Sequence, residues 1–262
     1  MFLFLLYLLV GAFAGLLAGL FGIGGGMVIV PVLVFSFVAV GVSPDVLTHS
    51  AVATSLASIV FTSISSVWTH HRNKAIIWRI VQLMTLGLIV GTAIGVFLIS
   101  SVPGPVLQKL IGVFALLLSV KMLLNWQPPG EGKEPGAAGL GLAGGVIGFG
   151  SAWFGIGGGT FTVPYLSWLR ISMRSAVATS AACGLPIAVV ATLTNIVVAW
   201  NHPDLPEWST GYVYWPAVLG IAIASVPSAR VGAKLAHSLD AKLLKRLFAI
   251  LLFIVGIRFL FF

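Results

Sequence analysis

Two glycine strings are the first recurring group in this sequence that could bind a ligand. The string GIGGG at residues 22–26, followed by Pro31, returns at residues 155–159, followed by Pro164. Because each glycine costs about 1 kcal/mol relative to alanine inside a helix, each string predicts a break between two helices. A helix that restarts after such a break presents free backbone N–H groups and a partial positive charge, which together favour an anion.

The restarting helices are expected to begin near Gly26 and Gly159 and to point their N-termini at one ligand. The candidate amide donors are the last three glycines of each string: Gly24, Gly25, Gly26, Gly157, Gly158 and Gly159. Close helix packing through small residues is the alternative interpretation. A dinucleotide site is excluded, because it needs a strand before the glycines and both strings have apolar, helix-length flanks.

The second recurring group is the string SAVATS, which occurs twice, 125 positions apart. It places Thr54 and Ser55 in one half of the chain and Thr179 and Ser180 in the other. These hydroxyls can complete an oxyanion cage by donating hydrogen bonds, or they can bond back to carbonyls of their own helix. Asn195, near the end of its apolar run, is a further candidate donor. We predict a substrate site built from these five side chains and the glycine amides.

The apolar runs lack the groups that cation, proton or metal chemistry would need. The six carboxylates all fall in or beside polar connectors: Asp45, Glu131, Glu134, Asp204, Glu207 and Asp240. The five histidines also lie at the ends of the runs, and the sequence holds no metal-ligating motif. We therefore expect no metal, no cofactor and no catalytic residue, and an anionic rather than a cationic ligand.

The elements that must position these residues are membrane helices. The chain has 262 residues, of which 59% are hydrophobic and 8% charged, a composition that a soluble domain with a charged surface does not have. Apolar runs of roughly 20 residues, which cross about 30 Å of hydrocarbon, fill nearly all of it. The net charge is +8, but the basic residues are scattered between the apolar runs and form no patch interleaved with aromatics. This pattern excludes nucleic-acid binding. The sequence predicts an all-α polytopic membrane protein in contact with the lipid bilayer.

A polar linker at residues 125–135 (NWQPPGEGKEP) divides the chain into two similar halves, 1–124 and 136–262. The apolar runs of the first half are 2–21, 27–42, 48–69, 78–100 and 105–124. Those of the second half are 137–153, 159–171, 175–200, 211–233 and 240–261. Each half is thus expected to begin with a glycine-broken helical hairpin and to continue with three transmembrane helices. The apolar N-terminus lacks the basic region of a signal peptide, so we expect it to be retained as a helix.

The positions of lysine and arginine predict that the halves are inverted repeats. If each glycine-broken segment crosses once, the 14 basic residues divide without bias between the two sides. If each break is a turn, only Lys109 and Arg258 lie on one side. The other side then holds Arg72, Lys74, Arg79, Lys121, Lys133, Arg170, Arg174, Arg230, Lys234, Lys242, Lys245 and Arg246. This positive-inside bias places both termini outside. Each glycine-broken hairpin consists either of two helices that both span the membrane or of a re-entrant pair of half-helices. In the second hairpin the apolar run after the glycines is short, which favours the re-entrant form.

These residues resemble the sulfite exporter TauE/SafE family, also called the toluene sulfonate uptake permeases. The resemblance rests on the duplicated glycine string with its proline, the SAVATS strings, the basic connector HHRNKAI at 70–76 and the small residues of the fourth segment. It covers essentially the whole chain. It implies a multi-pass protein of the bacterial inner membrane that transports small sulfur-containing anions such as sulfite, sulfonates or sulfoacetate.

In an inverted repeat, two broken segments that enter from opposite faces meet near the midplane, where many secondary transporters hold their substrate. We therefore expect a secondary transporter that works by alternating access. An anion channel with the same glycine and hydroxyl cage is the alternative. An intramembrane enzyme would need acids and arginines inside the membrane, which this sequence does not place there. The sequence leaves both a monomer and a homodimer open.

Overall fold

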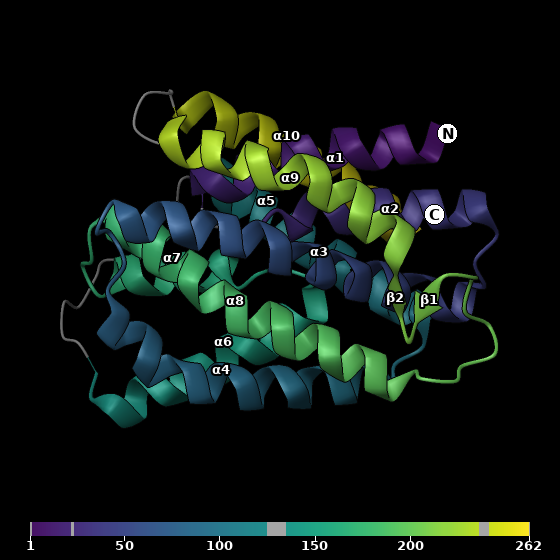
Figure 1. Ribbon diagram of the computed structural model, residues 1–262, viewed down its shortest axis with the longest axis horizontal. Coiled ribbons are helices and arrows are strands. Elements are labelled where there is room, and N and C mark those ends of the chain that lie inside the picture. Colours follow the sequence, from purple (N-terminus) through teal and green to yellow (C-terminus); the bar gives the residue numbers. More distant parts are fainter. Residues whose placement is uncertain (1, 22–23, 125–134, 236–240, 262) are drawn as a thin grey trace.

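The computed structural model describes residues 2–21, 24–124, 135–235 and 241–261, and it is almost entirely helical (Figure 1). The first half contains α1 (Phe2–Phe21), α2 (Gly26–Val40), α3 (Pro44–Arg72), α4 (Trp78–Ile99) and α5 (Gly104–Leu123). The second half contains α6 (Ala137–Phe154), α7 (Gly159–Trp168), α8 (Met173–Val198), α9 (Trp215–Leu235) and α10 (Ala241–Phe261). The strands β1 (Ser209–Thr210) and β2 (Val213–Tyr214) form a short antiparallel hairpin before α9. Gly22, Ile23 and residues 125–134 of the linker lie outside the described residues.

The helices confirm the prediction of an all-α polytopic membrane protein. Seven described helices are long and apolar enough to cross a membrane: α1, α3, α4, α5, α6, α8 and α9. Their ends lie within four residues of the apolar runs in the sequence. The longest, α3, has 29 residues and is the most deeply buried of the seven candidate spans. It is also one of the least hydrophobic of them, because it carries many serines and threonines.

Both glycine strings separate two helices, as the sequence predicts. α2 begins at Gly26 and α7 at Gly159. The residues before them, Gly25 and Gly158, have φ angles of 74° and 79°, which glycine adopts without the steric cost of a Cβ. With 10 residues, α7 is about 15 Å long, roughly half of the hydrocarbon thickness. Its length therefore favours a re-entrant second hairpin.

Small residues bring two pairs of helices into backbone contact. A Cβ on Gly15 of α1 would lie 2.6 Å from the Cα of Ser225 on α9. A Cβ on Gly91 of α4 would lie 2.7 Å from the carbonyl carbon of Gly145 on α6. In lipid the hydrophobic effect does not drive helices together, so membrane helices associate through close packing of this kind. The two pairs correspond between the halves, since α6 takes the place of α1 and α4 takes the place of α9 in the sequence repeat.

The contacts also fix the directions in which the helices run. Gly11 and Gly19 of α1 face Ile221 and Ala229 of α9, so α1 and α9 are parallel. In the same way α4 and α6 are parallel, because residues 87, 91 and 95 of α4 face residues 141, 145 and 149 of α6. α3 is parallel to α9, as the bonds from Thr54 to residue 214 and from Thr62 to residue 225 require. The chain reverses between α3 and α4 (Figure 1), so α1 and α6 run in opposite directions.

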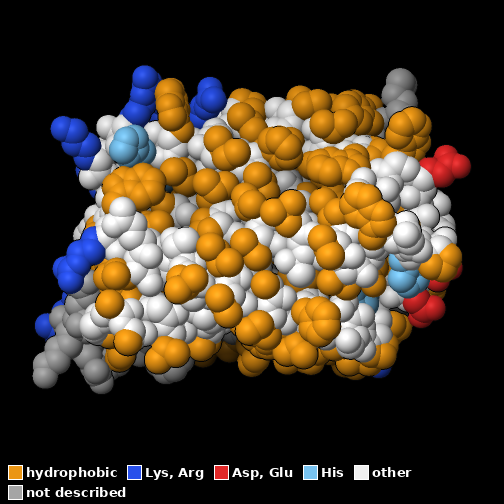
Figure 2. Space-filling model, turned by 60° about the horizontal axis from the view of Figure 1, so that its bottom comes forward, with side chains coloured by type: hydrophobic (Ala, Val, Ile, Leu, Met, Phe, Trp, Pro, Cys, Tyr) orange, Lys and Arg blue, Asp and Glu red, His pale blue; other side chains and the backbone are white. Residues whose placement is uncertain are grey.

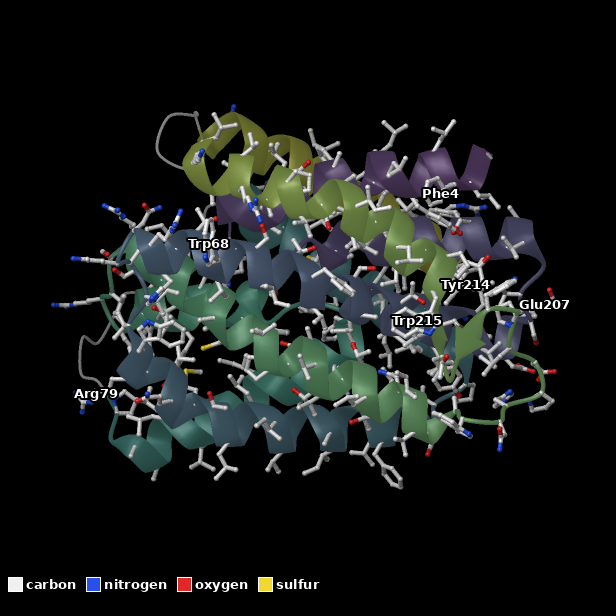
Figure 3. All side chains as sticks on the ribbon, in the orientation of Figure 1. Phe4, Trp68, Arg79, Glu207, Tyr214 and Trp215 are labelled. Atoms are coloured by element: carbon white, nitrogen blue, oxygen red, sulfur yellow. The ribbon has the colours of Figure 1, made fainter. Side chains whose placement is uncertain are left out.

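Charged side chains gather at the two ends of the molecule. On the face shown in Figure 2, most lysines and arginines lie at one end of the molecule, which we call the basic end. The acidic side chains lie at the other end, which we call the acidic end. Arg79 and Glu207 lie at these opposite ends in Figure 3. Both chain termini lie at the acidic end (Figure 1). Between the ends the surface is largely hydrophobic, which suits contact with lipid.

Candidate functional site

The two glycine strings touch each other at the middle of the bundle. A Cβ on Gly24 would lie 3.0 Å from the Cα of Gly157, and a Cβ on Gly157 would lie 3.0 Å from Cγ2 of Ile59. Ile59 lies near the midpoint of α3. We call this contact between Gly24, Gly157 and Ile59 the glycine crossing. Because glycine has no side chain, the two strings can approach each other this closely beside α3. They therefore place backbone groups from both halves of the chain in one space.

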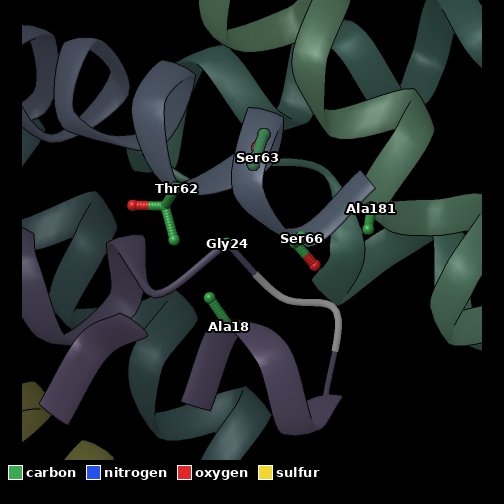
Figure 4. Close-up of a pocket in the computed structure, with 7 residues that line it drawn as sticks. Ala18, Gly24, Thr62, Ser63, Ser66 and Ala181 are labelled. Carbon is green, nitrogen blue, oxygen red and sulfur yellow. The ribbon is translucent and has the colours of Figure 1, made fainter. Parts of the chain in front are cut away.

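A small cavity lies directly beside the glycine crossing (Figure 4). Its described lining residues are Ala18, Gly24, Thr62, Ser63, Ser66, Gly157 and Ala181. The centre of a water-sized sphere can occupy a volume of about 10 Å³ in it. That is room for roughly one water molecule and too little for an oxyanion. An oxyanion can therefore bind here only if the surrounding helices move apart.

Three of the lining residues are hydroxyl side chains of α3. The Thr62 hydroxyl lies 3.2 Å from the Ser58 carbonyl oxygen, to which it donates, and 2.9 Å from the Ser225 hydroxyl. Ser63 and Ser66 are also buried, and the Ser66 hydroxyl has no hydrogen-bond partner among the described residues. A buried, unpaired hydroxyl beside a cavity can donate to an anion that enters it.

Sequence reasoning did not find these three hydroxyls. A signal was present, because Ser58, Thr62, Ser66 and Thr69 recur at helical spacing along one of the least apolar membrane helices. At the positions of α8 that correspond to Thr62, Ser63 and Ser66, the chain has Ile187, Ala188 and Ala191. The search for groups repeated in both halves therefore passed over them.

Polar groups continue from the cavity toward the basic end. The Ser65 hydroxyl donates a 2.8 Å hydrogen bond to the Val226 carbonyl and accepts one of 3.2 Å from Nε of Arg230. One turn further on, the Trp68 ring lies 4.0 Å from the Arg72 guanidinium and 5.5 Å from that of Arg230. These two arginines raise the positive potential at this end of α3, which attracts anions.

The two threonines of the SAVATS strings make equivalent bonds in the two halves. Thr54 accepts a 3.0 Å hydrogen bond from the backbone N–H of Tyr214, the residue before α9. Thr179 accepts a 3.0 Å hydrogen bond from the backbone N–H of Ile77, the residue before α4. Each hydroxyl thus satisfies a backbone donor at the start of a neighbouring helix, where four N–H groups lack partners within the helix.

The other predicted side chains also lie away from the cavity. Ser55 donates a 2.9 Å hydrogen bond to the Gly155 carbonyl, and Asn195 donates one of 2.8 Å to the Ala191 carbonyl of its own helix. Ser180 is completely buried. None of the five predicted side chains is among the described lining residues, whereas Gly24 and Gly157 are. The remaining predicted glycines, Gly25, Gly26, Gly158 and Gly159, form the starts of α2 and α7.

The described lining of the cavity holds no ionisable side chain. In the described parts of the chain, no three His, Cys, Asp or Glu residues gather as metal ligands. The polar groups around the glycine crossing are therefore backbone amides and neutral hydroxyls. Such groups can donate hydrogen bonds to an anion without a formal positive charge.

Comparison with known proteins shows the family to which the chain belongs. The family model described as "Sulfite exporter TauE/SafE" matches residues 7–259. A probable membrane transporter protein of Haemophilus influenzae is 38% identical over 255 residues, which is 97% of each chain. Another, of Methanocaldococcus jannaschii, is 30% identical over 96% of this chain and 93% of its own. No solved structure matches the chain. The chain is a multi-pass membrane transporter protein and belongs to the sulfite exporter TauE/SafE family.

Proposed function

We propose that this protein is a secondary transporter of small sulfur-containing anions, such as sulfite, sulfonates or sulfoacetate, in the bacterial inner membrane. The anion binds at the glycine crossing, and the two halves of the chain move around it by alternating access. The observation that carries the proposal is the contact of Gly24 with Gly157 beside a cavity with hydroxyl groups. Membership of the family supports a sulfur-containing substrate.

In many secondary transporters alternating access is built on two inverted halves, and three observations support that relation here. α1 and α6, which begin the two halves, run in opposite directions. The helix pairs in backbone contact, α1 with α9 and α6 with α4, exchange with each other when the halves are exchanged. The basic end has the charge of a cytoplasmic face under the positive-inside rule, which leaves both termini outside.

The electrostatics of the crossing support an anion. α2 and α7 both begin at the crossing, so their first N–H groups and the positive ends of their dipoles lie close to it. The Ser66 hydroxyl adds a donor from α3. A cation would meet positive dipole ends and no carboxylate among the described lining residues. Selectivity for anions therefore needs no buried arginine.

The proposal is tested by measuring ligand binding and flux with purified protein. Thermal unfolding is recorded with sulfite, sulfate, thiosulfate, taurine, sulfoacetate and non-sulfur carboxylates, and labelled counterflow is then measured in liposomes. We expect one or more sulfur anions to raise the melting temperature and to exchange saturably. An equal response to every compound, or to none, contradicts the substrate class. Unsaturable flux with single-channel current would identify an anion channel instead.

Substitution of Ser66 locates the site. Ser66→Ala removes a donor beside the cavity, so the half-saturating anion concentration should rise about tenfold, the effect of one hydrogen bond to a charged group. Thr85→Val is the matched control, because the Thr85 hydroxyl donates to the Val81 carbonyl of its own helix at 2.6 Å and does not line the cavity. Equal half-saturation in Ser66→Ala and wild type would place the site elsewhere.

A further inference from the structure

Two arginines from different helices lie against one tryptophan ring at the basic end. The guanidinium of Arg72, the last residue of α3, lies 4.0 Å from the centre of the Trp68 ring. The guanidinium of Arg230 on α9 lies 5.5 Å from the centre of the same ring. Figure 3 places Trp68 at the opposite end of the molecule from Glu207. We call Trp68, Arg72 and Arg230 the arginine–tryptophan cluster.

The two positive charges of this cluster have no negative partner among the described residues. Both guanidiniums contact one ring, so they are close enough to repel each other. No described carboxylate forms a salt bridge with either of them. Asp45 lies in the first turn of α3, and Asp204 and Glu207 precede α9, whereas the cluster lies toward the far ends of both helices. An anion bound by both arginines would relieve their repulsion.

A buried serine anchors one of the two guanidiniums. The Ser65 hydroxyl accepts a 3.2 Å hydrogen bond from Nε of Arg230 and donates one of 2.8 Å to the Val226 carbonyl. Because Ser65 is buried, this anchor lies inside the contact between α3 and α9. The bond occupies one of the five N–H donors of the guanidinium. The other donors form a planar fork that suits a group with two acceptor oxygens, such as a phosphate.

Exposed apolar side chains continue from the cluster along α3 and α9. They recur at helical spacing and lead to one arginine on each helix: Phe61, Ile64 and Trp68 on α3, and Leu219 and Ile223 on α9. The two helices are parallel and in contact, so the two rows flank their line of contact. We call these rows, together with the two arginines, the α3–α9 surface. An acyl chain can lie along it with its headgroup at the arginines.

The cluster lies at the depth of lipid headgroups. Arg72 ends α3, and Arg230 lies in the last two turns of α9. Tryptophan favours the membrane–water interface because its ring is apolar and its N–H is polar. Basic sites between transmembrane helices bind the headgroups of anionic lipids. A small soluble anion would use only the arginines, whereas a phospholipid would also cover the apolar rows, so the combination favours a lipid.

Other arginines of the basic end lack this arrangement. Arg79 and Arg174 are exposed there, and neither lies over an aromatic ring within the described parts of the chain. The positive-inside rule accounts for such residues by their charge alone. It does not account for two guanidiniums held on one indole ring, one of them anchored by a buried hydroxyl.

We propose that the α3–α9 surface binds an anionic phospholipid of the leaflet at the basic end. The lipid phosphate accepts hydrogen bonds from Arg72 and Arg230, and an acyl chain lies along Phe61 and Ile64. Trp68 contacts the lipid where its headgroup meets its acyl chains. The bound lipid bridges α3 and α9. This inference does not depend on which anion the protein transports.

The test measures lipid binding by purified wild-type protein and by Arg72→Gln and Arg230→Gln. Thermal unfolding in detergent is recorded while phosphatidylglycerol, phosphatidylcholine or inorganic phosphate is added. We expect phosphatidylglycerol to raise the melting temperature of wild type at the lowest concentration of the three. Each variant should need about ten times more of it, as the loss of a hydrogen bond to a charged group requires. Arg79→Gln makes the same charge change at the same end and should respond as wild type does.

Three results would overturn the lipid site. The first is equal phosphatidylglycerol affinity in wild type and in both arginine variants. The second is an equal loss in Arg79→Gln, because net charge rather than the cluster would then attract the lipid. The third is equal protection by inorganic phosphate, which would assign the cluster to a soluble anion. Both substituted arginines are exposed and lie on different helices, so one variant serves if the other does not fold.

Discussion

Gly91 and Gly145 face each other where α4 meets α6, but they are not interchangeable. A Cβ on Gly91 would lie 2.7 Å from the carbonyl carbon of Gly145 and in still closer contact with its oxygen. A Cβ on Gly145 would meet nothing nearer than the Gly87 carbonyl oxygen at 3.8 Å. The backbone contact therefore depends on only one of the two glycines.

This asymmetry predicts opposite effects of the same substitution. Gly91→Ala should destabilise the protein by about 2 kcal/mol, because the added methyl forces the two backbones apart. Gly145→Ala should be neutral or stabilising by up to about 1 kcal/mol, since alanine is the better helix former. Thermal unfolding in detergent measures both. Equal effects of the two substitutions would show that α4 and α6 do not approach as described.

The threonines at positions 54 and 179 are predicted to act as helix caps. Thr54→Val and Thr179→Val should each cost about 1 kcal/mol, because the N–H of Tyr214 or Ile77 then loses its acceptor. Thr54→Ser and Thr179→Ser keep the oxygen and should stay near wild-type stability. Thermal unfolding of the four variants is the measurement. Valine variants of full stability but weakened anion binding would instead assign the hydroxyls to the substrate site.

The bond between Ser55 and Gly155 joins α3 to the second hairpin. Ser55→Ala removes the 2.9 Å hydrogen bond to the Gly155 carbonyl and should cost about 1 kcal/mol of stability. Because Ser55 does not line the cavity, the half-saturating anion concentration should change little. Unfolding and counterflow measured on the same preparation separate the two effects. A large loss of affinity without loss of stability would contradict this role.

The sidedness of the loops tests the inverted arrangement. Arg79→Cys, Arg174→Cys and Glu207→Cys each place a thiol at an exposed position, and the native Cys183 is buried. In cells, a membrane-impermeant maleimide should label position 207 from outside and positions 79 and 174 only after the inner face is exposed. The unsubstituted protein, which should not react, is the control. Labelling of 79 and 174 from opposite faces would refute the inversion.

The helices could be read from the sequence because their signals are local. Apolar runs of membrane-spanning length set the ends of the spans, and glycine strings fixed the restarts at Gly26 and Gly159. The contact between Gly24 and Gly157 was expected from the inferred inversion, which needed only a count of basic residues. The partners of each helix, such as α1 with α9, depend on packing across the bundle and were not predicted.

The hydroxyls were harder to assign because recurrence has two causes. Thr54 and Thr179 each accept a hydrogen bond from the residue before a neighbouring helix, so a repeated structural role explains their recurrence as well as a repeated substrate site does. The position that corresponds to Ser66 in the second half holds Ala191, so a comparison of the two halves does not single out this hydroxyl. The hydroxyl of a serine or threonine in a membrane helix can donate a hydrogen bond to its own helix or to a neighbouring one. Its neighbours in the folded structure determine which bond forms, and the sequence alone does not give them.

Counterflow through a Gly157→Ala variant tests the glycine crossing most directly. Gly157 does not have a positive φ angle, so alanine fits its backbone, but the new methyl would lie 3.0 Å from Ile59 and 3.3 Å from Gly24. Gly141→Ala, with nothing nearer than 3.8 Å, is the control. We predict saturable exchange of a sulfur oxyanion by wild type and control, and at least tenfold slower exchange by a folded Gly157→Ala protein. Wild-type exchange by Gly157→Ala would contradict an anion site at the crossing.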